Sequence, residues 1–105
     1  MRFESNNCIA IHLKSLAKAE RFFSDILGFK LRSKTRTYLE YDTGHFMLYV
    51  NRSSKAQPPT PSFRVKSISR ARKLLKGAGC EIVVDRGDSL YFRDPFGNIF
   101  DVVER

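Results

Sequence analysis

The sequence predicts an α+β fold built from two βαβββ modules in pseudo-twofold repeat, with curved mixed sheets around a cleft. Two internal similarities support this prediction. Residues 13–23 (LKSLAKAERFF) align with residues 65–75 (VKSISRARKLL) at a constant offset of 52. Residues 44–52 (GHFMLYVNR) align with residues 97–105 (GNIFDVVER) at an offset of 53. Only two copies exist, which excludes a solenoid and indicates a paired module.

The first predicted strand has one buried face. The large aliphatic residues Ile9, Ile11 and Leu13 occupy every second position of this segment. The positions between and before them hold Cys8, Ala10 and His12. Alternation with a period of two is typical of a half-buried strand. The corresponding segment of the second copy runs through Thr60, Ser62 and Arg64.

A helix is predicted after each of these strands. Ser15 and Ser67 are favourable N-cap residues, and Gly28 and Gly79 stand where the helices should end. Apolar residues follow at helical spacing, namely Leu16, Ala19, Phe22, Phe23 and Ile26 in the first copy and Ile68, Ala71, Leu74, Leu75 and Ala78 in the second.

Three short strands are predicted after each helix, at 29–34, 37–42 and 45–51 and again at 81–85, 88–93 and 98–104. Asp94-Pro95-Phe96-Gly97 is a strong turn signal between the last two. Residues 53–61 contain three prolines and form the only predicted linker. The chain is therefore expected to be a single domain over 1–105, with module one about 1–52 and module two about 62–105.

One helix can bury only one face of a four-stranded sheet. Because Ile9, Ile11 and Leu13 belong under the helix, Cys8, Ala10 and His12 should lie on the uncovered face. Two such uncovered faces are expected to enclose the cleft.

Composition narrows the class of protein. The chain carries 19 Lys and Arg against 11 Asp and Glu, a net charge of +8 that favours anionic partners in general. The basic residues are spread evenly, and no nucleic-acid-binding motif is present, so nucleic acid is not the expected partner. No run of 18 apolar residues and no signal-peptide pattern occurs, which predicts a cytoplasmic protein without a membrane partner. The two cysteines predict thiols, and the small size favours a homodimer.

Two segments of the chain resemble a known family. The path from the first strand through Lys18-Ala19-Glu20-Arg21-Phe22-Phe23 to Ile26-Leu27-Gly28-Phe29 looks like the first module of the vicinal-oxygen-chelate superfamily. The segment Tyr91-Phe92-Arg93-Asp94-Pro95-Phe96-Gly97-Asn98-Ile99-Phe100-Asp101 resembles its closing motif. The superfamily includes glyoxalases, extradiol dioxygenases, epimerases, thiol transferases and non-catalytic antibiotic-binding proteins, so the resemblance implies a fold more than a function.

The resemblance also implies where a metal would be held. The metal-ligand positions of the superfamily correspond here to Cys8, Leu48, Thr60 and Asp101. Leu48 cannot coordinate a metal and Thr60 is a poor ligand. A thiolate and one carboxylate make a poor site for a hard metal, and catalytic zinc usually has three protein ligands. No metal and no cofactor are therefore expected.

The predicted ligand-binding cleft contains eight residues: Cys8, His12, Leu48, Thr60, Arg64, Tyr91, Arg93 and Asp101. Cys8 and His12 lie about 13 Å apart along a strand, too far for a direct hydrogen bond, and Cys8 is expected to be a packed small residue. His12 could contact a ligand or be half-exposed on the sheet.

Arg64 and Arg93 offer two alternatives. A planar guanidinium can bind a carboxylate or a phosphate, or it can form an ion pair with Asp101. We expect one arginine to pair with Asp101 and the other to contact ligand. Five side chains are candidates either for the apolar walls of the cleft or for the core: Tyr38, Tyr41, Phe46, Leu48 and Tyr91.

Two functions therefore remain as hypotheses. The first is a metal-free small-molecule-binding protein of this superfamily whose ligand is anionic or aromatic. The second is a divergent, metal-dependent lyase or thiol transferase of the glyoxalase type, and the sequence does not decide whether the protein is an enzyme.

Overall fold

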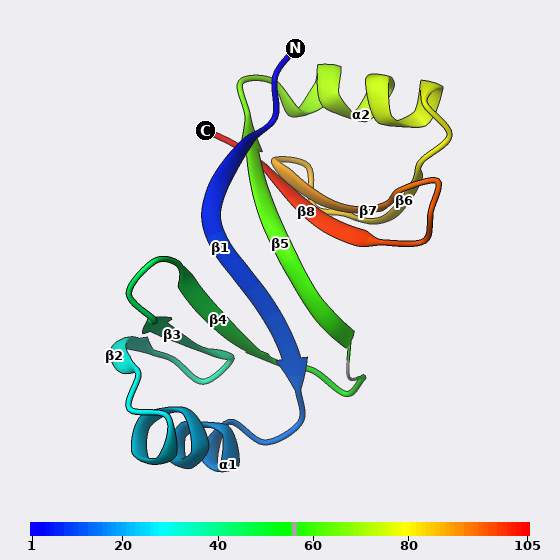
Figure 1. Cartoon of the computed structure of the whole chain (residues 1–105). Helices are drawn as coiled ribbons and strands as arrows, with labels where there is room; N and C mark the ends of the chain where they lie inside the picture. The colour runs from blue at the N-terminus through cyan, green and yellow to red at the C-terminus, as the bar shows by residue number, and fades with distance from the viewer. Residues whose placement is uncertain (56) are drawn as a thin grey trace. The chain divides into compact units, whose positions relative to one another are not determined.

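The computed structural model describes residues 1–55 and 57–105, so Ala56 of the predicted linker lies outside the described residues. The elements follow the predicted order (Figure 1). They are β1 (Glu4–Leu13), α1 (Leu16–Glu20), η1 (Arg21–Ile26), β2 (Lys30–Lys34), β3 (Tyr38–Asp42), β4 (Met47–Arg52), β5 (Gln57–Val65), α2 (Ile68–Gly77), β6 (Glu81–Asp85), β7 (Ser89–Arg93) and β8 (Ile99–Glu104). In the described part of the chain, no helix is long and apolar enough to cross a membrane.

The chain divides into two compact units. Residues Asn7–Thr60 form one unit, called here the first module, and Met1–Asn6 with Pro61–Arg105 form the other, called the second module. Each is a four-stranded mixed sheet with a helical segment, which confirms the predicted α+β class and the duplicated βαβββ pattern.

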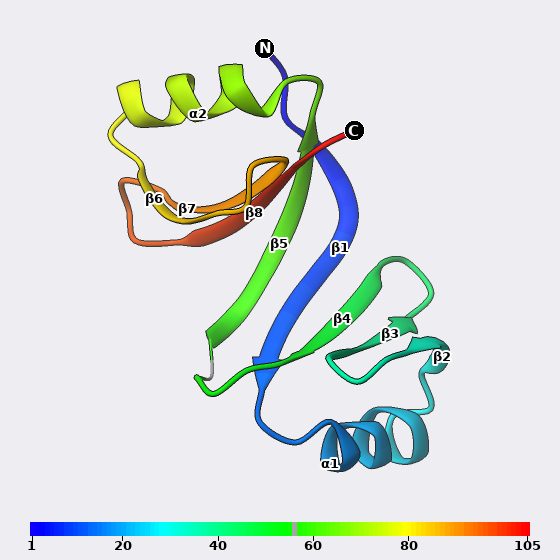
Figure 2. The ribbon, with the colours of Figure 1, turned by 180° about the vertical axis from the view of Figure 1, so that it is seen from behind.

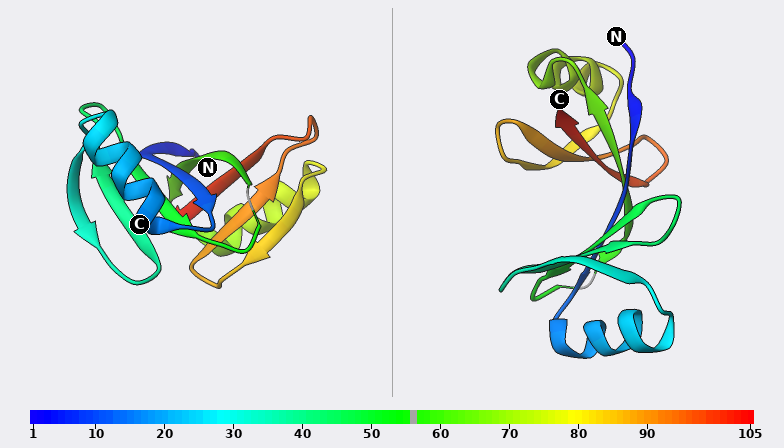
Figure 3. Two further views of the ribbon diagram at one scale, coloured as in Figure 1. Left: turned by 90° about the horizontal axis from the view of Figure 1, so that it is seen from below. Right: turned by 90° about the vertical axis from the view of Figure 1, so that its left-hand side faces the viewer.

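In the first module the strands lie in the order β2-β3-β4-β1, with β1 parallel to β4 and the other pairs antiparallel. The helical segment of α1 and η1 lies along one face of this sheet, as Figure 3 also shows. The core between them holds five buried side chains: Ala19, Leu39, Tyr41, Leu48 and Val50. Ile9, Ile11 and Leu13 pack against this core, as the alternation predicts.

In the second module the order is β5-β8-β7-β6, with β5 parallel to β8. Helix α2 covers one face of the sheet, which is seen from behind in Figure 2. The buried residues between them are Val65, Ile68, Ala71, Leu75, Leu90, Phe92 and Val102. The two cores correspond almost residue for residue, because the same stripe of each helix faces the same side of each sheet.

Both helices begin at the predicted caps. Ser15 accepts a hydrogen bond from the backbone N–H of Lys18, and Ser67 accepts one from Arg70, each at 3.2 Å. Gly28 follows the first helix with a φ of 72°. This left-handed conformation is unfavourable for residues with a side chain, so glycine suits the helix end. The two helices differ after the first turns, because the first continues as a π-helix over Arg21–Ile26.

The predicted linker is shorter than expected. Strand β5 begins at Gln57 and includes Pro58, Pro59 and Pro61. Proline has no N–H to donate, but the pairing of β5 with β8 begins only at Ser62. The three prolines therefore lie before the part of β5 that pairs with β8. The linker prediction rested on their number in the sequence, and the structure places them in a strand.

The strand register corrects the second internal alignment. Ile11 pairs with Val50, and Phe63 pairs with Val102, so the last strands of the modules correspond at an offset of 52 rather than 53. The turn between β7 and β8 is one residue longer than the turn between β3 and β4. A shift of one residue exchanges the two faces of a strand. The counterpart of Asp101 is therefore Tyr49, and Leu48 belongs to the helix-covered face.

Candidate ligand-binding site

The face of each sheet that its helix leaves uncovered is called here the open face. In the second module Val65, Leu90, Phe92 and Val102 point toward α2. The alternating neighbours on the same strands therefore lie on the open face. They are Ser62, Arg64, Ser89, Tyr91, Arg93, Asp101 and Val103.

A short chain of hydrogen bonds crosses this open face. The side-chain amide of Asn6 donates to the Ser62 hydroxyl at 3.1 Å, and that hydroxyl donates to an Asp101 carboxylate oxygen at 2.7 Å. Ser62 and Asp101 are also Cα partners in the parallel pairing of β5 with β8. Ser62 is buried, so both of its hydrogen bonds are made away from bulk water.

The surroundings of Asp101 raise the pKa of its carboxyl above the ordinary value. Burial raises the pKa of the Asp101 carboxyl, while the hydrogen bond from Ser62 and the charges of Arg86 and Arg105 act in the opposite direction without cancelling it. A carboxyl of this kind can accept a hydrogen bond or donate one, depending on its partner.

Tyr91 completes the cluster. It is 6% exposed, and burial together with the negative charge of Asp101 raises the pKa of its hydroxyl. The guanidinium of Arg86 lies 5.1 Å from the centre of the Tyr91 ring, which is cation–π geometry. A hydroxyl, a carboxyl, a phenol and a cation thus meet on one open face. This set can recognise a small polar molecule with an aromatic or acidic part.

The two predicted arginines are engaged elsewhere. Arg64 forms an ion pair with Glu4 at 3.3 Å, and Arg93 forms one with Glu81. The expected ion pair of Asp101 with one of these arginines is therefore wrong for the described residues. Each arginine has a nearer glutamate, and Asp101 is held by Ser62 instead.

The four positions that correspond to metal ligands do not form a donor set. Leu48 lies in the core of the first module, and the Thr60 hydroxyl donates to the carbonyl of Pro58 at 3.0 Å. Cys8 lies on the open face of the first module, and Asp101 is hydrogen-bonded to Ser62. Within residues 1–55 and 57–105, no group of three His, Cys, Asp or Glu side chains could hold a metal ion. The residues therefore do not fit the metal centre that the superfamily implies.

The open face of the first module carries different side chains at the equivalent positions. Cys8 and His12 lie on it, half-buried, opposite Met47 and Asn51 of β4. Tyr38 and Tyr49 also belong to this face, with ring centres 6.0 Å apart. Tyr38 is one of the wall residues that the sequence suggested, whereas Tyr49 was not among them.

Two other aromatic residues that could have lined a cleft belong to the core. Tyr41 is fully buried under the helix, and its hydroxyl shares a 2.8 Å hydrogen bond with Ser24. Phe46 packs against the same core. For these residues the structure decides for the core and against a ligand wall.

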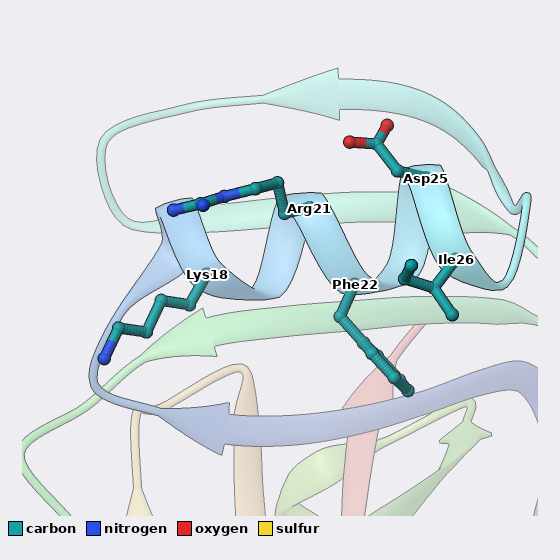
Figure 4. A pocket seen from close by; sticks show the side chains of 5 residues that line it. All are labelled: Lys18, Arg21, Phe22, Asp25 and Ile26. Carbon is teal, nitrogen blue, oxygen red and sulfur yellow. The ribbon is translucent and has the colours of Figure 1, made fainter.

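A shallow depression lies on the outer surface of α1 and η1 (Figure 4). Phe22 and Ile26 project from one side of the helix there, 48% and 72% exposed, and Lys18, Arg21 and Asp25 complete the lining. All five residues come from one helix, and no buried polar group converges on the depression. The open face of the second module is therefore the stronger candidate site.

The eight predicted cleft residues did not include three members of the candidate site: Asn6, Ser62 and Arg86. The sequence did indicate that Ser62 shares the strand parity of Thr60 and Arg64. Arg86 follows β6 in a turn, and only the fold brings its side chain over Tyr91. Asn6 precedes the module boundary in the chain yet belongs to the second module.

Several solved structures with the same fold are of a single enzyme, in different variants and complexes. A variant of homoprotocatechuate 2,3-dioxygenase from B. fuscum matches with a TM-score of 0.74 and 19% identity, over 98% of this chain and 33% of that chain. The complex of the Brevibacterium fuscum enzyme with 3,4-dihydroxyphenylacetate matches with a TM-score of 0.73 and 19% identity, over 98% of this chain and 37% of that one. The chain thus spans about a third of the length of these relatives. At this identity the likeness shows the fold alone.

No curated protein matches the chain. The family model of the Glyoxalase/Bleomycin resistance protein/Dioxygenase superfamily matches residues 7–102, which includes most of both modules. The repeated βαβββ modules and the parallel pairing of the first and last strand in each agree with this match. The chain therefore belongs to the glyoxalase/bleomycin resistance protein/dioxygenase superfamily.

Proposed function

We propose that the protein binds a small aromatic molecule with an acidic group, without a metal ion. The observation that carries this proposal is the cluster of Ser62, Asp101, Tyr91 and Arg86 on one open face. Arg86 supplies a cation for the acidic group, and the Ser62–Asp101 pair supplies a hydrogen-bonding partner for a ligand hydroxyl.

The choice of Arg86 over Arg64 and Arg93 follows from their partners. Arg64 and Arg93 each contact a glutamate, whereas the Arg86 guanidinium lies over the Tyr91 ring. The charge of Arg86 acts on Asp101, but Arg86 forms no ion pair among the described residues, so an acidic ligand breaks no ion pair there. The ring of Tyr91 keeps this guanidinium on the site, which lowers the ordering cost of binding.

The proposal is tested by calorimetric titration with three probes: benzoate, 4-hydroxybenzoate and 3,4-dihydroxyphenylacetate, with catechol as a neutral comparison. We expect Arg86→Gln to weaken binding of the acids by about tenfold, the value of one charge-assisted hydrogen bond. The matched control is Arg36→Gln, since Arg36 is an exposed arginine in the corresponding turn of the first module. Equal weakening by both variants, or no binding of any probe to the wild type, would contradict the proposal.

A separate experiment tests the proposal that binding does not require a metal ion. Elemental analysis of purified protein after exposure to Ni²⁺, Zn²⁺, Fe²⁺ and Mn²⁺ should find no stoichiometric metal, and the methylglyoxal–glutathione adduct should not turn over. Stoichiometric metal together with turnover would instead support the glyoxalase-type lyase or thiol transferase.

A further inference from the structure

A cavity of the second module lies where residues next to the start of β1 and the ends of β5 and β8 come together. Its volume is about 240 Å³, and it is lined by Arg2, Glu4, Arg64, Val65, Lys66 and Arg105. Pockets for drug-sized ligands usually measure about 300–1,000 Å³, so this cavity suits a smaller guest.

The lining of this cavity is strongly cationic. Four of its six residues carry a positive side chain, and Glu4 is the one that carries a negative side chain. Glu4 pairs with Arg64 at 3.3 Å, but both side chains are about half exposed (49% and 50%), so water weakens the pair. Three cations, Arg2, Lys66 and Arg105, remain without a salt bridge among the described residues.

Two carboxylates near this cavity accept hydrogen bonds from other groups. Glu104 accepts the backbone N–H of Ile68 at 2.9 Å, at the start of α2. Asp101 accepts the Ser62 hydroxyl. The charge of Arg105 also acts on Asp101. The lining itself still carries four positive side chains and one negative side chain, and a ligand or solvent ions can neutralise this excess.

We propose that this cavity binds a multivalent anion of the phosphate class. Guanidinium groups match the oxygens of a phosphate in bidentate geometry, and three guanidinium groups line the cavity. Bringing the like charges of Arg2, Lys66 and Arg105 together costs free energy that a compact anion with two or more charges offsets. An aromatic acid of the kind proposed for the open face carries one negative charge and offers no second charge to these cations, so this site is distinct and does not rest on that proposal.

The test is calorimetric titration with inorganic pyrophosphate at fixed ionic strength. We expect saturable binding by the wild type and a loss of roughly tenfold or more in affinity for Arg2→Gln/Lys66→Gln, which removes two charged partners. The matched control is Arg70→Gln/Lys73→Gln, which removes the same charge from the exposed side of α2 in the same module. This control should change the affinity by less than about twofold.

Further arms identify the source of the phosphate. Inorganic phosphate, ATP and a short single-stranded DNA oligonucleotide are compared with pyrophosphate on the same variants. Preferential loss with Arg2→Gln/Lys66→Gln for free phosphates or ATP supports the proposal. Equal loss in both double variants would show that the general positive field is responsible, and binding of DNA alone, or of no probe, would also overturn the proposal.

Two measurements keep the result interpretable. Thermal unfolding should show no loss of stability in either double variant, because the substituted side chains are exposed. Arg2→Gln/Lys66→Gln should be slightly more stable than the wild type, because it relieves repulsion between like charges. Arg2→Lys/Arg105→Lys keeps the charge but removes the bidentate fork, so it should bind pyrophosphate more weakly than the wild type and more tightly than Arg2→Gln/Lys66→Gln. If it binds as tightly as the wild type, the guanidinium geometry has no role and the proposed recognition is wrong.

Discussion

The two modules differ far more on their open faces than in their cores. In the cores, Ala19 corresponds to Ala71, Leu39 to Leu90 and Val50 to Val102. On the open faces, Ala10 stands where the second module has Ser62, Tyr49 where it has Asp101, and Glu40 where it has Tyr91.

The difference has a physical explanation. A residue between helix and sheet must fill a space of given volume without a polar group, so few side chains are suitable there. A residue on the open face is not constrained by the helix that covers the other side. The second module uses this freedom for a hydrogen-bonded pair, Ser62 and Asp101, and the first for two tyrosine rings, Tyr38 and Tyr49. Functional residues are therefore expected at the open-face positions where the two modules differ.

The largest expected effect tests whether the two cores are equivalent. Leu39→Ala and Leu90→Ala each remove a side chain with 0% exposure at matched positions. Each should lower the free energy of unfolding by about 2–5 kcal/mol through lost burial and a residual cavity. Urea denaturation measures both, and a difference between the two variants of more than about 2 kcal/mol would show that one module is packed much less tightly.

A smaller effect is expected where one core carries a hydroxyl that the other lacks. Tyr41 takes the place of Phe92, and its hydroxyl is hydrogen-bonded to Ser24 at 2.8 Å. Tyr41→Phe and Ser24→Ala should each cost about 0.5–1.5 kcal/mol, and the double variant should cost less than the sum. A double-mutant cycle by urea denaturation measures the coupling. Strict additivity would mean that this hydrogen bond does not stabilise the fold.

The smallest effect concerns pH and has opposite signs in the two modules. The pKa of Asp101 is raised by burial, so the unfolded chain releases this proton at lower pH than the folded chain. The folded state therefore loses relative stability as the pH rises above 3.8, and Asp101→Asn should stabilise the protein at neutral pH but not in acid.

Asp42 in the first module provides the comparison. Hydrogen bonds from the Gly44 backbone N–H and from Arg32 lower the pKa of its carboxyl. The ionised Asp42 carboxylate therefore stabilises the folded state above pH 3.8, and this stabilisation is lost as the pH falls. Asp42→Asn should destabilise the protein slightly at neutral pH and have no effect in acid. Thermal unfolding of both variants between about pH 3 and pH 7 distinguishes the two signs. The same sign for both would contradict the difference between the two environments.

Much of the fold could be predicted because it depends on local patterns. The alternation of Ile9, Ile11 and Leu13, the caps at Ser15 and Ser67, and the stop at Gly28 each act within a few residues. The extent of β5 was not predictable in this way, since Pro58, Pro59 and Pro61 are equally typical of a linker. Nor did any local signal separate the π-helical turns of Arg21–Ile26 from an ordinary helix.

The candidate site was predicted less completely. Tyr91 and Asp101 were named from their positions, but the partner of Asp101 was expected to be Arg64 or Arg93. Those arginines pair with Glu4 and Glu81, residues on other strands whose proximity depends on register. Leu48 was included as a metal-ligand position implied by the family resemblance, and the internal alignment paired it with Asp101. That alignment was one residue out of register, and a single residue decides which face of a strand a side chain occupies.

The sequence alone determined the duplicated module, the class of fold and the superfamily, because the spacing of apolar residues and turn signals is written along the chain. Only the tertiary structure decided which polar side chains meet. Ser62 and Asp101 are 39 residues apart, and Arg86 reaches Tyr91 from a turn. Contacts of this kind depend on strand pairing and burial across the module, which no short stretch of sequence specifies.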